Sequence, residues 1–194
     1  MSLGKAFFWQ VEDWAWNLRC RYNFWLHGPY GLAKVVEKMP FRFIIKYLRK
    51  YGARVGDGCQ FERGLNLHRP FGKKPFENLV LGRNVYIGHN ALIDLSRRVE
   101  IKDRVIIASR CQFWTHASYY AQEDVDDPGY GENYGQILIE EGALIYSNVV
   151  VAHGVKIGKF ARVGACAFVN KAVPAGDFVA GVPARSVRPA AEKA

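Results

Sequence analysis

Aliphatic residues recur at every sixth position along the C-terminal part of the chain. The run is unbroken through Ile139, Ile145, Val151, Ile157, Val163 and Val169. A small or β-branched residue stands four positions after each of them, from Ala143 to Val173. An amphipathic helix needs apolar spacings of three and four, and a half-buried strand needs alternation, so neither explains a period of six. The period indicates short strands joined by corners and stacked as a solenoid.

The same period runs through the middle of the chain. Its members are Leu81, Ile87 and Ile93, then, after a shift of two residues, Ile101, Ile107 and Phe113, with a degenerate start at Val55 and Phe61. Three hexads make one triangular coil, so the pattern predicts roughly five or six coils, above the minimum that repeat stability requires. Glycines that follow the aliphatic residue, such as Gly82 and Gly158, suit a corner that either excludes a side chain or needs a positive φ.

Residues 1–54 lack this period. The segment Val35–Tyr51 has mostly helical apolar spacing interrupted at Pro40, and an aromatic segment, Phe7–Trp25, precedes it. His27–Gly31 is typical of a turn between two helices. We therefore divide the chain into a helical cap at 1–54, a β-helix at 55–174 with an inserted loop at 114–136, and an extended segment at 175–194.

Charge is distributed unevenly along the chain. The 194 residues carry a formal net charge of +9, and residues 1–54 hold ten Lys or Arg against three acidic residues. The N-terminal segment can therefore be a cap over the open end of the solenoid, or a basic amphipathic surface that lies on anionic lipid. No stacking or groove-reading motif accompanies the charge, so nucleic acid is not an expected partner.

Composition adds two expectations about compartment. The four cysteines lie far apart without CxxC spacing, which favours reduced thiols over a zinc knuckle or a disulfide framework. No unbroken apolar signal region and no long apolar run is visible. We expect a cytoplasmic protein, with contact to the inner face of the membrane as an open alternative.

The hexad phase is lost between Phe113 and Ile137. Thr115-His116, just after Phe113, opens an acidic, Tyr-rich excursion. A break of this length in a compact fold is usually functional or disordered. Here the chain resembles the hexapeptide-repeat acetyltransferases of the maltose, galactoside and colanic-acid type, in which such a pair at the mouth of a loop carries the catalytic histidine. The resemblance implies a left-handed parallel β-helix, a homotrimer, acetyl-CoA as co-substrate and His116 as general base. Imidazole titrates near neutrality, as that role requires.

The stretch from Val163 to Arg185 is similar to the closing segment of the same family, which binds acetyl-CoA between neighbouring subunits. That resemblance implies a set of cofactor-binding residues along the pantetheine, the nucleotide and the phosphates: Ser147, Ala165, Asn170, Lys171, Arg185 and Arg188. The acceptor site is expected to include Asn90, Asp94, Thr115 and Tyr119.

Two departures keep other readings open. Leu144 stands where the family often has tryptophan, and Tyr146 stands where it often has glycine. His153 replaces a usual proline. A histidine there resembles the base of amino-sugar N-acetyltransferases, so His153 is an alternative base or a supporting residue. Gamma carbonic anhydrases share the fold, but they have two histidines five residues apart, and Ala121 stands five after His116. No metal is therefore expected.

The function predicted from the sequence is acetyl transfer from acetyl-CoA to a hydroxyl of a sugar or sugar nucleotide in surface-polysaccharide biosynthesis. The alternatives are N-acetylation of an amino sugar or nucleotide sugar with His153 as base, and, more remotely, a non-enzymatic scaffold or a gamma-type carbonic anhydrase. The sequence alone does not identify the acceptor.

Overall fold

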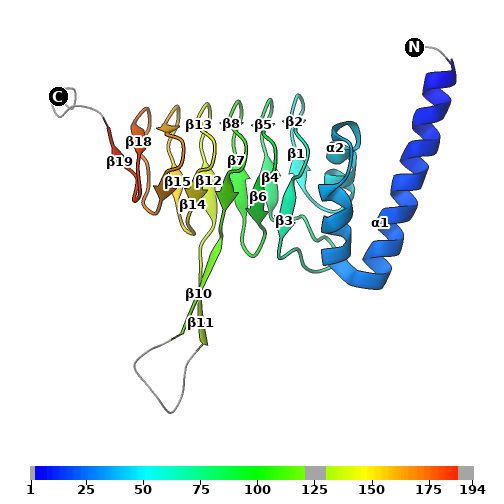
Figure 1. Ribbon diagram of the computed structural model, residues 1–194, viewed down its shortest axis with the longest axis horizontal. Helices are drawn as coiled ribbons and strands as arrows, with labels where there is room; N and C mark the ends of the chain where they lie inside the picture. The colour runs from blue at the N-terminus through cyan, green and yellow to red at the C-terminus, as the bar shows by residue number, and fades with distance from the viewer. Residues whose placement is uncertain (1–2, 121–129, 188–194) are drawn as a thin grey trace.

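The computed structural model describes residues 3–120 and 130–187. Its body is a triangular solenoid of short parallel strands that form three sheets (Figure 1). Sheet A contains β1 (Arg54–Val55), β4 (Leu79–Leu81), β7 (Val99–Ile101), β12 (Ile137–Ile139) and β15 (Lys156–Ile157). Sheet B contains β2 (Gln60–Phe61), β5 (Tyr86–Ile87), β8 (Ile106–Ile107), β13 (Leu144–Ile145), β16 (Arg162–Val163), β18 (Phe178–Ala180) and β19 (Arg185–Ser186). Sheet C contains β3 (Asn66–His68), β6 (Leu92–Asp94), β9 (Gln112–Phe113), β14 (Val150–Val151) and β17 (Phe168–Val169).

Each coil takes one strand from each sheet in turn, which gives five complete coils and part of a sixth. The sixth begins at Val173, which bridges Ile157, and continues into β18, which pairs with β16. The mainly β fold and the coil number predicted from the hexads are confirmed, and the solenoid is the left-handed β-helix. The boundary expected at residue 174 is wrong, because β18 still belongs to a coil and only β19 turns back, antiparallel to β18.

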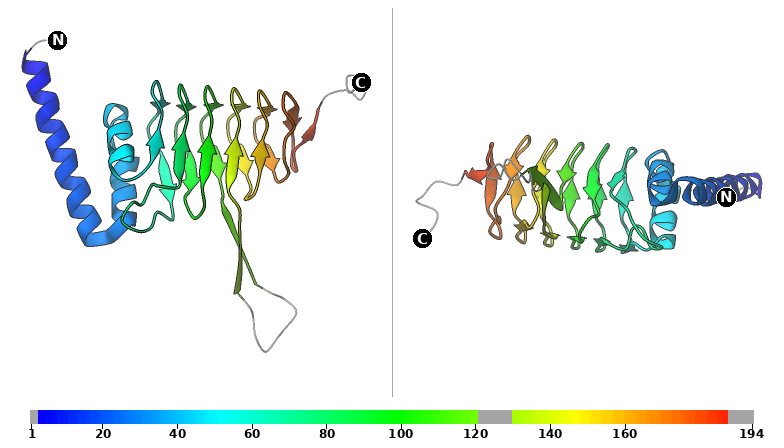
Figure 2. Two further views of the ribbon diagram at one scale, coloured as in Figure 1. Left: turned by 180° about the vertical axis from the view of Figure 1, so that it is seen from behind. Right: turned by 90° about the horizontal axis from the view of Figure 1, so that it is seen from below.

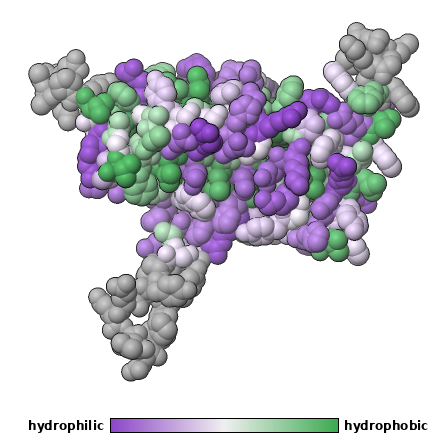
Figure 3. All heavy atoms as spheres, viewed as in Figure 1, coloured by the Kyte–Doolittle hydropathy of each residue, from purple (hydrophilic) through white to green (hydrophobic). Residues whose placement is uncertain are grey.

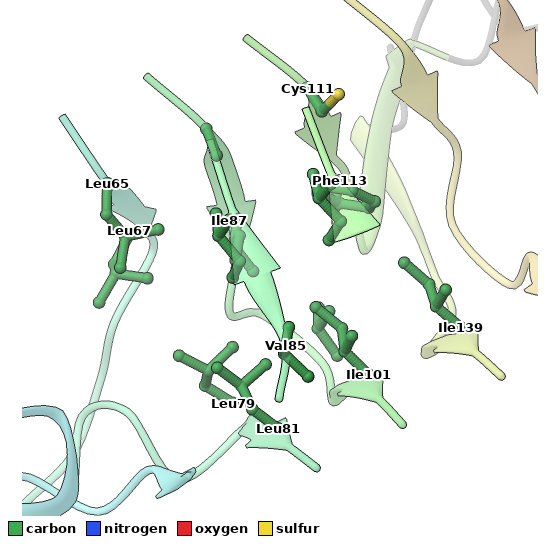
Figure 4. Packing of buried hydrophobic residues seen from close by; sticks show 14 of the residues in the cluster. Leu65, Leu67, Leu79, Leu81, Val85, Ile87, Ile101, Cys111, Phe113 and Ile139 are labelled. Carbon is green, nitrogen blue, oxygen red and sulfur yellow. The ribbon is translucent and has the colours of Figure 1, made fainter. Parts of the chain in front are cut away.

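The aliphatic residue of each hexad points into the prism and stacks on its counterpart one coil away. Leu81, Ile101, Ile139 and Ile157 are partners in register along sheet A, and none is more than 3% exposed (Figure 4). Full burial of a side chain of this kind stabilises a fold by about 1.5–3 kcal/mol. The period of six in the sequence is therefore the period of the core.

The glycines that directly follow the aliphatic residue are required by close approach between coils and not by a positive φ. A Cβ on Gly82 would lie 2.6 Å from the backbone nitrogen of Asp103, and one on Gly158 would lie 2.5 Å from that of Ala175. The positive φ angles at the corners of the prism fall largely on non-glycine residues, Asn84 and Asn148 among them. Close approach between coils and a positive φ therefore both occur at a corner, but at different positions within it.

Two helices cover the N-terminal end of the prism. Helix α1 (Leu3–Glu37) is kinked at Gly28, which has a φ of 60°, and Pro29 follows the kink. Helix α2 (Phe41–Lys50) buries Phe43, Ile44, Tyr47 and Leu48. Figure 2 shows α2 next to the first coil and the long first part of α1 beyond α2. No helix in the described ranges is long and apolar enough to cross a membrane.

The excursion after Phe113 is not structureless at its base. Strands β10 (His116–Tyr120) and β11 (Tyr130–Tyr134) form an antiparallel ladder that projects from the prism as an arm (Figure 1). Gly135 closes the base, since its N–H donates to the carbonyl of Thr115 over 2.9 Å. The first residue of this arm is His116.

Candidate active site

The site lies on the edge of the prism where sheet C passes to sheet A. At this edge the third coil leaves β9 after Phe113, and the arm begins at His116, directly after Thr115. In the coil before it, Asp94 ends β6 on the same edge, and His68 ends β3 as its register partner. Stacking of coils therefore brings together three residues that are far apart in the sequence.

A buried carboxylate is the centre of the site. Asp94 is 0% exposed. Its Oδ1 accepts hydrogen bonds from the backbone N–H of Ser96 at 3.2 Å and from the Ser96 hydroxyl at 2.9 Å. Its Oδ2 accepts from the backbone N–H of Thr115 at 2.9 Å and from the Thr115 hydroxyl. These donors compensate for the loss of water that burial of a carboxylate entails.

The fifth donor to Asp94 is the ring of His116. Its Nδ1 lies 2.7 Å from Asp94 Oδ2, and the side chain of His116 is 12% exposed. Burial would raise the pKa of Asp94, but the hydrogen bonds from His116, Thr115 and Ser96 outweigh it and hold the pKa below its ordinary value. An ionised Asp94 accepts the Nδ1 proton of His116, which fixes the ring in the tautomer whose Nε2 carries a lone pair.

Aromatic rings surround His116. His68 is stacked on it, with ring centroids 5.8 Å apart and an interplanar angle of 13°. Trp114 and Tyr134 lie 6.0 and 6.2 Å from it between centroids. Burial lowers the pKa of His68, so this second imidazole is neutral at neutral pH and places no positive charge beside His116.

A cleft of about 310 Å³ opens beside this cluster. Its lining comes from four parts of the chain: Tyr30 of α1, the Arg69–Phe71 segment, the Ser96–Arg97 turn and Tyr134 of the arm. The guanidinium of Arg97 lies 4.1 Å above the ring of Tyr134. The cleft has the mixture of aromatic and polar groups that is typical of small-molecule sites.

A second groove, of about 340 Å³, lies at the C-terminal end of the prism. It brings together Lys171 and Arg185, two of the residues expected to bind a cofactor, along a floor that includes Val173 and Ala184. Two cations above an apolar floor suit a ligand that has both phosphates and an uncharged chain.

The structure rules out two of the four expected acceptor contacts. Asp94 and Thr115 are each 0% exposed and are engaged with each other and with His116, so neither can touch a substrate. Asn90 is exposed on the corner between sheets B and C, the edge that also carries Ser147 and Ala165, so its contact with the acceptor stays a prediction. The fourth, Tyr119, lies in β10, and its side chain is outside the described residues.

The expected cofactor residues fall on two edges. Asn170 and Lys171 lie on the edge between sheets C and A, the edge that carries His116. Ser147 and Ala165 lie on the edge between sheets B and C. One subunit therefore does not gather them into a single surface, and Arg188 lies outside the described residues.

The alternative base, His153, lies one coil beyond His116 on the same edge, between β14 and β15. It is half-buried, and a Cβ on Gly135 would lie 3.2 Å from its carbonyl carbon. Within the described ranges no carboxylate orients its ring, in contrast to His116.

Sequence reasoning missed the partner role of Asp94 and the presence of His68 and Ser96. The coil register contains the signal: Ile93 pairs with Phe113, so Asp94 lies directly below Trp114 and next to Thr115-His116. A carboxylate one coil below a candidate histidine could have been identified by this stacking. Among the described residues, no group of three His, Cys, Asp or Glu is placed to hold a metal ion.

Comparison with known proteins agrees with the repeat. Residues 137–171 match the family model described as bacterial transferase hexapeptide (six repeats). A curated 2,3,4,5-tetrahydropyridine-2,6-dicarboxylate N-acetyltransferase from Staphylococcus aureus (strain bovine RF122 / ET3-1) is 46% identical over 56 residues, which are 29% of this chain and 23% of that protein. The match therefore spans less than a quarter of the length of that relative.

Solved structures match over most of the chain. A hexapeptide-repeat acetyltransferase from Vibrio cholerae, complexed with acetyl-CoA, aligns with a TM-score of 0.71 and 23% identity over 82% of this chain and 84% of that one. A galactoside acetyltransferase in complex with coenzyme A aligns with a TM-score of 0.70 and 25% identity over 84% and 81%. The chain thus has the left-handed β-helix fold of the hexapeptide-repeat acetyltransferases, and residues 137–171 carry the hexapeptide repeat.

Proposed function

We propose that this protein is an acetyl-CoA-dependent acetyltransferase that acetylates a hydroxyl of a sugar or sugar nucleotide, with His116 as general base. The observation that carries the proposal is the hydrogen bond of 2.7 Å between His116 Nδ1 and the buried Asp94. It orients the ring, stabilises the imidazolium that forms during reaction and leaves Nε2 as the proton acceptor. The solved relatives that contain acetyl-CoA or coenzyme A support the choice of donor.

In the proposed reaction, one histidine both takes up and returns the proton. His116 Nε2 takes the proton of the acceptor hydroxyl as its oxygen bonds to the thioester carbonyl carbon. When the C–S bond breaks, the imidazolium returns that proton to the sulfur, so that the products are the acetyl ester and the free thiol of coenzyme A. His68 remains neutral in this scheme, and the cleft bounded by Tyr30, Arg97 and Tyr134 holds the acceptor.

A homotrimer is part of the proposal. Ser147 and Ala165 lie on one edge of the prism, and Asn170 and Lys171 lie on another. If the first edge of one copy faces the second edge of its neighbour, the four residues line one groove, which agrees with the family resemblance. Light scattering of the purified protein tests this arrangement, since a monomer would leave the groove incomplete.

The test of the reaction is thiol release from acetyl-CoA with a panel of neutral sugars, amino sugars and their nucleotide-linked forms. The wild-type protein is compared with His116→Ala and His153→Ala. We expect turnover on a hydroxyl acceptor that His116→Ala abolishes and His153→Ala preserves. Turnover on an amine that depends on His153 would replace the proposal with N-acetylation, the activity named for the curated relative.

A further inference from the structure

Helix α1 carries an apolar stripe that nothing in the described chain covers. The outer stripe consists of Phe8, Val11, Trp14, Leu18, Tyr22 and Trp25. These residues recur at spacings of three and four, so they share one face of the helix. Their exposed fractions run from 48% for Val11 to 80% for Trp25. Exposed apolar surface that forms a continuous patch usually marks an interaction site.

The opposite face of α1 is the one that packs on the rest of the protein. Glu12 and Asp13 pair with Arg42 and Lys46 of α2, and Cys20 is fully buried. Figure 2 shows α2 between the first part of α1 and the first coil. Because the face of α1 that carries Glu12, Asp13 and Cys20 packs toward α2, the outer stripe on the opposite face is directed away from the prism. Hydrophobic side chains are visible along this outer margin in Figure 3.

Acidic and basic residues also lie on different faces of the helix. The two acidic residues of the segment 8–27 are Glu12 and Asp13, and both are engaged with α2. Arg19 and Arg21 are exposed, and at 3.6 residues per turn they fall on the two borders of the outer stripe. The outer surface of α1 therefore presents tryptophan, tyrosine and leucine between two arginines and has no acidic residue.

We propose that the outer stripe of α1 docks the protein on an anionic lipid surface. Tryptophan and tyrosine have an apolar body with a polar tip, which suits the boundary between lipid headgroups and acyl chains. Arginines on the borders reach the anionic headgroups while the stripe enters the bilayer surface. The basic excess of residues 1–54 adds long-range attraction to the same surface.

The position of α1 favours a membrane over another copy of the chain as the occupant. Prisms that assemble side by side with parallel axes contact each other along their flanks. Their end layers then remain uncovered and all face the same direction. The outer stripe belongs to such an end layer (Figure 1). Several copies of α1 would then engage one flat surface together, and their affinities would reinforce each other.

The experiment is sedimentation of the full-length protein with vesicles. One set of vesicles is phosphatidylcholine alone, and the other contains phosphatidylserine as well. We expect binding to the anionic vesicles that weakens as salt is raised, because salt screens the arginines. In the triple variant Trp14→Ser/Leu18→Ser/Trp25→Ser, binding falls by about tenfold or more, since most of the inserted apolar area is lost.

A matched control substitutes apolar residues of similar exposure on the prism. Ile106 and Phe160 are 48% and 53% exposed, and Ile106→Ser/Phe160→Ser is expected to bind vesicles as the wild-type protein does. Arg19→Gln/Arg21→Gln is expected to weaken the preference for anionic vesicles, since the other basic residues of 1–54 remain, and to leave binding to phosphatidylcholine vesicles unchanged. Circular dichroism confirms that each variant is folded.

Two results would overturn the proposal. One is a wild-type protein that does not sediment with anionic vesicles at low salt. The other is a triple variant that binds as tightly as the wild type. If the triple substitution instead changes the size of the particle in solution while the wild type ignores vesicles, the outer stripe is an interface between copies and the membrane assignment is wrong. Thiol release in solution reports on the proposed chemistry independently of all these results.

Discussion

Two edges of the same prism use charge in opposite ways. On the edge between sheets A and B, exposed side chains form a ladder in which Arg83 contacts Asp103 at 2.9 Å and Lys159 contacts Glu141 at 2.8 Å. On the edge between sheets C and A, Asp94 is fully buried and accepts five hydrogen bonds. The strands that flank both edges pair in register from coil to coil, so the difference between the two sets of carboxylates lies in their burial.

This difference separates a surface feature from a site. Exposed ion pairs contribute little, because water and salt screen them and long side chains lose freedom when they pair. A buried carboxylate costs stability unless every lone pair is compensated, and such costs concentrate at functional sites. The ladder pairs lie at the solvated surface. Asp94, fixed by its other donors, in turn holds the ring of His116 in one orientation.

The largest expected effect is that of Asp94→Asn. An amide cannot accept from all five donors, and its own NH₂ group opposes them, so His116 loses its fixed tautomer. We expect the turnover number to fall by about 10²–10⁴, the range for general-base catalysis. The free energy of unfolding should also fall by about 1–3 kcal/mol, as for a buried polar group left without its partner. Thiol-release kinetics and urea unfolding measure the two effects.

Asp103→Asn on the ladder is the control for that substitution. Asp103 accepts from the backbone and side chain of Arg83, which lowers its pKa, but it is solvent-exposed. We expect no measurable change in turnover and none in unfolding at moderate salt. An equal loss in both variants would show that burial does not distinguish the two edges.

The next effect is the dependence of stability on pH. The pKa of Asp94 is lowered in the folded protein, so its ionised form contributes stability that is complete above the unfolded value of about 3.9. That stability is lost as pH falls through the lower folded pKa. Urea unfolding between pH 7 and 2 should show this acid loss at both low and high salt, whereas the contribution of Asp103 should vanish at high salt.

A smaller effect is expected for His68→Phe. The phenyl ring preserves the stack on His116 and removes a group that, with its lowered pKa, is neutral at neutral pH. An aromatic pair contributes about 0.5–1.5 kcal/mol, so we expect turnover to change by less than about tenfold. Loss as complete as in His116→Ala would instead make His68 a proton-transfer residue.

The smallest effect is expected for Glu141→Gln in the ladder. Glu141 contacts both Lys159 and Arg104, but its side chain is only half-buried and those of its two partners are exposed to solvent. Turnover and the midpoint of urea unfolding should both be unchanged within error. A clear loss of stability would show that the ladder acts as a network and not as separate surface pairs.

The fold could be predicted from the sequence because the residues that define the period of six are the core residues. Each aliphatic residue at a sixth position from Ile139 to Val169 points into the prism and is buried by its neighbours in the adjacent coils. The end of the β-helix was misplaced because the hexad phase shifts by two residues between Val169 and Val173, and β18 follows in the new phase. The helical structure predicted for Val35–Tyr51 is present, with the interruption expected at Pro40, which lies between α1 and α2.

The site was predicted only in part. His116 was identified because it follows the break in the hexad phase. Asp94 was predicted to contact the acceptor, because the sequence of a strand does not reveal whether a carboxylate at its end is buried. Its partners come from Ser96, two residues on, and Thr115, in the next coil, so the assignment needed the register between coils. Tyr30 and Arg97 reach the cleft from separate elements, and no local pattern connects them.

The most direct test of the account is a double-mutant cycle on kcat/KM with Asp94→Asn, His116→Ala and the combined variant. If Asp94 acts through His116, its substitution has no further effect once His116 is absent, and the double variant equals His116→Ala within error. If the two losses add, Asp94 serves the reaction by a route that does not pass through His116, and the central claim is wrong.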